Sequence, residues 1–494
     1  MIAKLEQFLF YFLFFVIPFQ TRKILYSPGW YYNEWQSVSI YATDILPIVL
    51  FLFWGFSAVR SSKFSIFPFD SKFRALNLLK GNFQFSNKLQ IQNSKKFLNF
   101  LISQFLKPDF FLVLFLAAAL ISVKNSSDFY SGLFLWLQLV EFALFYFYLK
   151  TYAIKKFDFI KILCALILGG VFQAVIAAGQ FLKQGDLGLR WLGESVLGSH
   201  MTGIASFYTF VGDKVIRAYG TTSHPNILAA YLLLAIFAFY FLILYRNKPH
   251  YLHSHIMIYG NVGYVLLLFG LFFTFSRTII FLWVAGFLTI VVASIWAGSK
   301  TPVDKRLRKS FIHRLVSLFL VTFVVIGVFS LLYWPEVQSR MTLSSEEEAV
   351  RLRIFYNEES LKGGINLFGI GLGDFTGWLT EQNPNLPRHV YQPVHNIYLL
   401  IYSEIGIIGF VLFLLFLTGL FYEFIKKTRL CELKHYSFLL VVASVLFIGL
   451  FDHFLLTLQQ GRFVLWIGLT LLAIGDIIQT GGYHGKEKGT GDQV

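Results

Sequence analysis

The feature that most constrains this chain is a series of apolar segments, each about as long as a bilayer is thick. A spanning helix needs about 20 mainly apolar residues, because the hydrocarbon core is about 30 Å thick. Twelve segments fit this description. They are 5–19, 42–59, 109–124, 129–149, 159–181, 225–245, 256–275, 278–297, 315–334, 397–424, 437–455 and 461–478. The sequence therefore predicts an all-α, polytopic transmembrane protein with about 12 spans.

The composition excludes a soluble globular domain. Hydrophobic residues make up 56% of the 494 residues and charged residues only 14%, whereas soluble domains carry about 25% charged residues. The net charge of +15 favours cytoplasmic Lys/Arg loops beside anionic lipid over nucleic-acid binding. Cys164 lies in an apolar segment and Cys431 in a basic loop, so neither indicates a disulfide, a metal site or a nucleophile. The apolar segment 5–19 lacks a small-residue cleavage site after it, which predicts a retained first helix.

The basic residues of the loops predict the topology. Lys and Arg gather in 60–107 and after the fourth, sixth, eighth and tenth apolar segments. With twelve spans, all these loops share the side of both termini, and positive loops lie in the cytoplasm. The domain prediction has four parts: 1–334 holds transmembrane helices 1–9 with a basic cytoplasmic insertion at 60–107, 335–396 is a large extracytoplasmic loop containing short helices, 397–478 holds helices 10–12, and 479–494 is a cytoplasmic tail.

Three polar features meet on the predicted outer face. Arg217 precedes His224-Pro225-Asn226 at the sixth span, Arg277 lies in a tight turn before the eighth, and His395 stands at the mouth of the tenth. The spans that follow run inward, so their positive N-terminal ends point outward and favour an anion. Two guanidinium groups can bind phosphate oxygens bidentately, and a neutral imidazole can accept a proton near physiological pH.

Each of these signals has a simpler interpretation. An arginine at the outer end of a helix often contacts lipid headgroups, and a single histidine there is often only an interfacial residue. Three such residues at helix mouths on one side favour a site. Glu404 follows His395 by nine residues, about 13 Å deeper along a helix, which is too far to orient the imidazole directly.

Other chemical motifs are weaker. The turn Gly369–Gly373 has no preceding strand and no following Lys-Ser, which excludes a nucleotide-binding loop. Glu141 lies deep in the fourth span and is either a functional acid or a hydrogen-bonded structural one. The pair Asp452-His453 alone does not make a site, and no cluster of acids and histidines has metal spacing, so we expect neither metal nor cofactor.

The order of the motifs resembles that of the O-antigen ligase and polymerase superfamily of bacterial membrane glycosyltransferases. The resemblance extends over the whole chain and is most specific from about 350 to 410. The matching pieces are Pro18–Lys23, Arg217…Gly220…His224-Pro225-Asn226, Ser276-Arg277, Arg351–Tyr356, Phe368–Gly373, His395–Leu399, Glu404-Ile405-Gly406, Gly409 and Asp452…Gln459-Gln460-Gly461. The proline that usually precedes the Gly-x-Gly turn is replaced by Asn366-Leu367.

The resemblance implies a GT-C-like fold and a metal-independent, inverting reaction. A glycan would pass from undecaprenyl diphosphate to a hydroxyl of lipid A-core, a glycan or a protein, on the outer face of the cytoplasmic (inner) membrane. By motif, Arg217 and Arg277 would bind the diphosphate and His395 would be the base. The accessory candidates are Arg351, with Arg353 as its alternative, and Asn396, His224 and Glu404. Lipid-linked donor, acceptor and bilayer are the expected partners, without nucleic acid.

Functions of other classes make different predictions. Within the family, a polysaccharide polymerase or a protein O-oligosaccharyltransferase differs from a ligase only in its acceptor. A transporter or lipid-linked glycan flippase should instead place charged groups near the bilayer midplane, often in broken helices. Glu141 stands nearly alone there in the sequence, while polar residues concentrate in the outer loop. A membrane scaffold with a sensing loop leaves the two arginines and His395 unexplained. The concentration of polar residues in the outer loop favours an enzyme with an external site.

Overall fold

The computed structural model describes residues 2–27, 34–60, 107–245, 254–300, 305–342, 348–428 and 433–479. A helix occupies each of the twelve apolar segments. These helices are α1 (Ile2–Val16), α2 (Ala42–Arg60), α4 (Pro108–Ser122), α5 (Phe129–Tyr148), α7 (Phe159–Lys183), α8 (Pro225–Tyr245), α9 (Ser254–Phe273), α10 (Arg277–Lys300), α11 (Lys305–Leu332), α15 (Ile397–Lys427), α16 (Leu433–Ile448) and α18 (Gln459–Gln479).

The described helices confirm a multi-pass helical membrane protein. Eight of them are long and apolar enough to cross a membrane, and two more, Gly260–Phe273 and His435–Ile448, are apolar but shorter. The count of about 12 spans and the orientation of the chain stay predictions. The basic insertion and the tail lie almost wholly outside the described residues.

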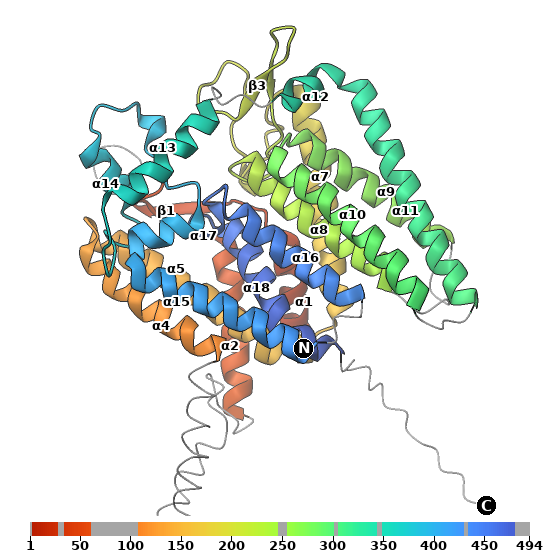
Figure 1. The fold of residues 1–494 in the computed structure, drawn as a ribbon, viewed down its shortest axis with the longest axis horizontal. Coiled ribbons are helices and arrows are strands. Elements are labelled where there is room, and N and C mark those ends of the chain that lie inside the picture. Colours follow the sequence, from red (N-terminus) through yellow and green to blue (C-terminus); the bar gives the residue numbers. More distant parts are fainter. Residues whose placement is uncertain are drawn as a thin grey trace, which may run out of the picture.

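The chain is mostly helical, as the sequence predicted, and it also contains two short hairpins that the sequence did not predict. An antiparallel hairpin pairs β1 (Arg22–Tyr26) with β2 (Val38–Tyr41), and a second pairs β3 (Ser206–Tyr208) with β4 (Lys214–Ile216). Strands of three to five residues are too short for their alternation to stand out in a sequence. Both hairpins lie between apolar segments, on the same side of the bundle as α12 (Trp334–Met341), α13 (Glu348–Lys362) and α14 (Phe375–Gln382) (Figure 1).

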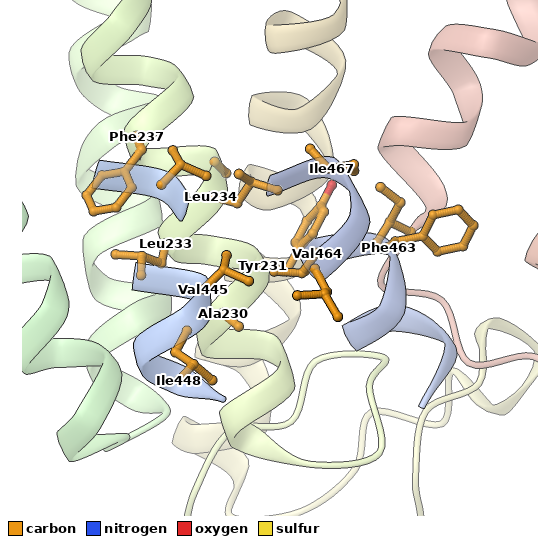
Figure 2. Close-up of a cluster of buried hydrophobic side chains, with 14 of the residues drawn as sticks. Ala230, Tyr231, Leu233, Leu234, Phe237, Val445, Ile448, Phe463, Val464 and Ile467 are labelled. Carbon is orange, nitrogen blue, oxygen red and sulfur yellow. The ribbon is translucent and has the colours of Figure 1, made fainter. Parts of the chain in front are cut away.

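Helix α8 forms the centre of the bundle. It is apolar around its whole circumference and almost entirely buried, as expected for a core helix. Figure 2 shows its side chains packed between those of α16 and α18; the labelled residues are Ala230, Tyr231, Leu233, Leu234, Phe237, Val445, Ile448, Phe463, Val464 and Ile467. The Tyr231 hydroxyl donates to the Phe14 carbonyl at 2.8 Å. Tyr231, in the second turn of α8, therefore joins this helix to α1.

Helix α15 is broken near its N-terminal end. Gly406 has φ +83°, a conformation that residues with a side chain rarely adopt. The break frees backbone groups, and the Gly-rich segment 366–373 pairs with them: Ile370 N–H donates to the Ser403 carbonyl at 2.9 Å, and Gly371 N–H to the Glu404 carbonyl at 3.1 Å. The Ser122 hydroxyl of α4 also donates to the Glu404 carbonyl, at 2.8 Å. The sequence predicted an uninterrupted apolar helix here and missed the break.

Candidate functional site

His395 lies in the short segment that leads into α15. Its Nδ1 is 3.1 Å from the Pro393 carbonyl. Because a carbonyl oxygen only accepts, this contact requires the hydrogen on Nδ1, which leaves Nε2 as the proton-accepting nitrogen of the neutral ring. The ring stacks on Tyr356 of α13, with centroids 5.2 Å apart, and meets His453 edge-on at 4.8 Å. The imidazole is thus fixed by three different parts of the chain.

The turn between α16 and α18 supplies the second histidine and an acid. His453 Nδ1 is 2.8 Å from the Thr457 hydroxyl, and its ring lies edge-on to Trp35 at 4.9 Å. Asp452 accepts a hydrogen bond from Asn226 Nδ2 at 2.8 Å. The turn is held against the start of α15, because Ile397 N–H donates to the Gly449 carbonyl at 2.8 Å. This packing brings Asp452 and His453 to His395.

Asn226, in the first turn of α8, joins the arginine to this group. Its Oδ1 accepts from Arg217 Nη2 at 2.7 Å and from the Ser276 hydroxyl at 3.0 Å, while its Nδ2 donates to Asp452. Arg217 also donates from Nε to the Thr274 carbonyl at 2.6 Å. The Asn226 side chain therefore connects the segment that leads into α8, the α9–α10 turn and the α16–α18 turn.

A third histidine stands beside Asn226. His224 Nδ1 accepts the Asn226 backbone N–H at 3.2 Å, so the ring is unprotonated at that nitrogen. Burial, followed by the charge of Arg217, lowers the pKa of His224 to about 3. His224 is consequently neutral at physiological pH.

Two arginines, one from α12 and one from α13, complete the cluster. Arg340 of α12 donates to the Phe275 carbonyl at 3.4 Å, and Arg353 of α13 donates to the Phe451 carbonyl at 3.3 Å. Burial, followed by the charge of Arg340, lowers the pKa of Arg217 to about 9, which still leaves it protonated at pH 7. The site is therefore strongly positive before any ligand binds.

Asp452 is the carboxylate that faces this positive charge. Burial by itself raises its pKa, but the nearby histidines and the Asn226 amide lower it to about 2. The pKa of His395 is lowered, first by burial; Asp452 opposes this and Arg353 adds to it. Burial, followed by His395, also lowers the pKa of His453, to about 3. At neutral pH the histidines are neutral and Asp452 is ionised.

The main predicted site residues fall into two groups, one of three residues and one that contains Arg277. Arg217, His224 and His395 meet around Asn226 and Asp452. Arg277 begins α10 directly after Ser276, and its Nη1 donates to the Thr342 carbonyl at 3.2 Å.

The remaining candidates have other surroundings. Asn396 caps α15, since its Oδ1 accepts the backbone N–H groups of Tyr398 and Leu399. Glu404 is buried at the helix break, 3.4 Å from the Phe375 N–H. Of the two arginines left open by motif, Arg351 is exposed on α13, and Arg353 lies against the cluster.

Sequence reasoning missed Asn226, Asp452, His453, Tyr356 and Arg340. Asn226, Tyr356 and Asp452 stood within motifs that carry the resemblance but were given no role, and the pair Asp452-His453 was otherwise weighed only as a metal site. Their role comes from packing between distant segments; Asn226 and Asp452 are 226 positions apart. Among the residues that the structure describes, no group of three or more His, Cys, Asp or Glu is arranged to hold a metal ion.

The expectation that Glu141 stands nearly alone is wrong. Asp44 and Arg462 lie within electrostatic reach of it. Arg462, buried in the first turn of α18, donates from Nη1 to Gln138 Oε1 at 2.6 Å, and Asp44 accepts from Gln459. This buried network joins α2, α5 and α18. Asp44, Gln459 and Arg462 belong to the first turns of their helices, away from the helix middles.

Comparison with known proteins gives one family match. Residues 262–414 match a family model described as O-Antigen ligase. The matched segment runs from α9 into α15 and contains Arg277, Arg340, Arg353, Tyr356 and His395. No curated protein matches the chain.

Proposed function

We propose that this chain is a membrane glycosyltransferase of the O-antigen ligase type, because residues 262–414 match a family model described as O-Antigen ligase. It moves a glycan from an undecaprenyl-diphosphate carrier to an acceptor hydroxyl. The reaction takes place on the outer face of the cytoplasmic membrane, with both termini in the cytoplasm. It inverts the anomeric configuration and needs no metal ion.

The observation that carries the proposal is the meeting of a correctly oriented imidazole with an arginine cluster. His395 presents Nε2 because Nδ1 is bound to the Pro393 carbonyl. Arg217 is joined to the same group through Asn226 and Asp452. A base next to fixed cations suits a reaction in which a hydroxyl attacks and a diphosphate leaves.

His395 acts as the general base. Its Nε2 takes the proton of the acceptor hydroxyl as the oxygen attacks the anomeric carbon. The imidazolium that forms gains from the nearby carboxylate of Asp452, which raises the proton affinity of His395. Asp452 thus stabilises a charge that exists only late in the reaction, which is how an electrostatic group accelerates a step.

Arg217 and Arg277 bind the diphosphate. Guanidinium groups match phosphate oxygens in a bidentate geometry, and both residues lie near the N-terminal ends of α8 and α10, where the positive end of the helix dipole favours an anion. Arg340, which lowers the pKa of Arg217 by its charge, adds a third cation. As the bond to the sugar breaks, the growing negative charge on the diphosphate is held by these groups.

Two alternatives within the family share this chemistry. A polysaccharide polymerase and a protein O-oligosaccharyltransferase also need a base beside a diphosphate site, and they differ in the acceptor. A transporter or flippase is the alternative of another class, and the break in α15 and the buried Arg462 network are features such a protein uses. Here the break is filled by backbone of 366–373, and the network lies mainly at first turns of helices, which favours the enzyme.

The test is a transfer reaction with purified protein. The full chain in detergent receives an undecaprenyl-diphosphate-linked glycan and, in separate reactions, lipid A-core, a free oligosaccharide repeat unit or an acceptor protein. Mass spectrometry reads which acceptor gains the glycan, and His395→Ala serves as the inactive control. Movement of intact donor across proteoliposomes, without transfer to any acceptor, would instead identify a flippase.

A further inference from the structure

Tyr356 of α13 is buried directly against His395. Its side chain is 0% exposed. The two rings stack, with centroids 5.2 Å apart and planes only 7° apart. The contact joins α13 to the segment that leads into α15, and it restricts the plane in which the imidazole can lie.

The hydroxyl of Tyr356 is bound to the backbone. It donates to the Val390 carbonyl at 2.6 Å. Burial raises the pKa of Tyr356 above its ordinary value, so the phenol stays protonated near pH 7 and serves neither as an acid nor as a base. Tyr356 therefore offers His395 the face of a neutral aromatic ring.

The face of an aromatic ring distinguishes the two protonation states of an imidazole. It carries partial negative charge, and it attracts a cation that lies within about 6 Å of the ring centroid. The 5.2 Å between the His395 and Tyr356 centroids falls inside this range. A neutral His395 gains only packing from Tyr356, whereas an imidazolium gains the electrostatic attraction as well.

We propose that Tyr356 is the positioning residue of the base: its ring holds the His395 imidazole in one plane and stabilises the imidazolium that forms during transfer. This inference rests on the proposed function, in which His395 is the base. The acceptor O–H bond breaks, its proton bonds to His395 Nε2, and the electron pair stays on the oxygen that attacks the anomeric carbon. Tyr356 exchanges no proton. Because its attraction strengthens only as His395 becomes charged, it lowers the barrier to transfer.

A residue that only packs against His395 makes a different prediction. Tyr356 belongs to a small buried cluster with Phe375, Leu379, Val390, Val394 and Leu400. Burial is the main cause that lowers the pKa of His395, so a smaller side chain at position 356 would admit water and raise this pKa. A weaker negative face at constant ring shape leaves the packing intact. It lowers the pKa of His395 only if the face attracts the imidazolium.

Other titratable and charged groups also act on His395. Asp452 raises its pKa and Arg353 lowers it, and His453 and His224 lie within electrostatic reach. These groups come from the α16–α18 turn, from α13 and from the segment that leads into α8. They stay unchanged when only position 356 is altered, so a change in the pKa of His395 then reports the ring at that position.

The experiment alters the charge of the ring and not its shape. Tyr356 is replaced by phenylalanine and by phenylalanines that carry one, two or three ring fluorine atoms, which weaken the negative face step by step. The same series at Phe355 is the matched control, because Phe355 packs on the same cluster and its ring contacts Tyr356.

Two measurements are made on the full-length protein in detergent. Histidines labelled at Cε1 with the NMR-active carbon isotope are titrated without substrates to give the pKa of His395, whose resonance is identified by its absence in His395→Gln. Single-turnover transfer and donor binding are then measured near pH 7. Thermal melting checks that each variant folds.

We expect Tyr356→Phe and the Phe355 series to keep the pKa of His395 near that of wild type. The fluorinated series at position 356 lowers it progressively, by about 0.4–1.5 pH units with three fluorine atoms. The single-turnover rate falls in parallel by about 2- to 30-fold, and donor binding is unchanged.

A constant pKa across the series at position 356, an equal fall in the Phe355 series, or a transfer rate that does not follow the pKa would each overturn the proposal. Failure of the proposed function is distinguishable from these results. Wild type would then transfer glycan to none of the acceptors, while the titration, which uses no substrate, would still decide whether Tyr356 stabilises the imidazolium.

Discussion

At the scale of single residues, the chemistry depends on a backbone oxygen. The Pro393 carbonyl decides which nitrogen of His395 carries the hydrogen. A histidine at a helix mouth without such a partner would exchange between tautomers. The fixed tautomer is what separates a base from an interfacial residue.

Replacement of His395 tests its role. His395→Ala is expected to lose about 10²–10⁴-fold in single-turnover rate while donor binding stays near that of wild type. His395→Gln keeps a hydrogen bond but cannot accept the proton, so it is expected to be nearly as slow. Single-turnover kinetics and donor binding are measured for the three proteins. Recovery of the single-turnover rate in His395→Gln, or loss of donor binding alone in His395→Ala, would show that His395 has a structural role.

The pH dependence follows from the groups around His395. Its pKa is lowered by burial, so the base stays neutral, and kcat/KM should fall only as the pH drops below the ordinary value of about 6.5. Asp452 raises this pKa. Asp452→Asn is therefore expected to move the acid limb to lower pH and to reduce the plateau rate. A pH profile of kcat/KM for both proteins measures this, and an unmoved limb would exclude Asp452 as the counter-charge.

Replacement of either arginine should abolish transfer, but only replacement of Arg217 should also lower the melting temperature of the protein. Arg217→Ala and Arg277→Ala are expected to abolish transfer, and the Lys variants to keep a small remainder, because Lys retains the charge but not the bidentate fork. Arg217→Ala should also lower the melting temperature, since it removes bonds to Thr274 and Asn226, whereas Arg277 donates at the exposed Thr342 carbonyl. Transfer assays and thermal melts separate these effects. Wild-type transfer in both Ala variants would leave them as headgroup contacts.

At the scale of elements, the break in α15 fixes the approach to His395. The freed carbonyls of Ser403 and Glu404 accept N–H groups from the Gly-rich segment 366–373. That segment also packs on α4, where Asn125 donates to the Gly369 carbonyl at 2.9 Å. The first turns of α15 are thus positioned by segment 366–373 in addition to the rest of their own helix.

A glycine substitution tests this element. Gly406→Ala places a Cβ 2.5 Å from the Leu367 backbone at φ +83°, so it should destabilise the protein by about 1–3 kcal/mol or more and reduce transfer. Gly327→Ala in α11 is the matched control, because nothing lies within 4 Å of the added Cβ. Thermal unfolding in detergent measures both. Equal melting temperatures would show that the break tolerates a side chain.

The sequence predicted the positions of the helices better than it predicted the break in α15 and the two hairpins. Helix α15 begins at Ile397, where the predicted apolar segment begins, and helices occupy all the apolar segments. The break at Gly406 was missed because its cause is the docking of 366–373, a contact between segments. The hairpins were missed because each strand has few residues.

At the scale of the whole molecule, the topology is the prediction that all others require. With Cys164 and Cys431 replaced by Ser, single cysteines are introduced at Ile365 and Lys155, both exposed. In whole cells an impermeant thiol reagent is expected to label Ile365→Cys but not Lys155→Cys, because the positive loops lie inside. The reverse labelling would invert the chain and move His395 to the cytoplasmic side.

The site was predictable only in part. Arg217 and His395 stood out because they lie at helix mouths, which can be read from hydropathy alone. Asp452 and His453 did not, because the turn that carries them contacts Asn226 and His395 only once α8, α15, α16 and α18 are packed. The sequence did not show which of Arg351 and Arg353 belongs to the site, because the two residues differ only in the face of α13 on which they lie.

The hydrogen bond from Ser122 to Glu404 connects residues 282 positions apart, and this has a consequence for biosynthesis. A ribosome releases about 5–20 residues per second, so α4 waits many seconds in the membrane before α15 emerges. During that time the polar groups near Ser122 lack their later partner. The nascent chain cannot act on donor lipid before Asp452 has emerged. Activity should therefore begin only when the turn that carries Asp452 has packed against Asn226 of α8.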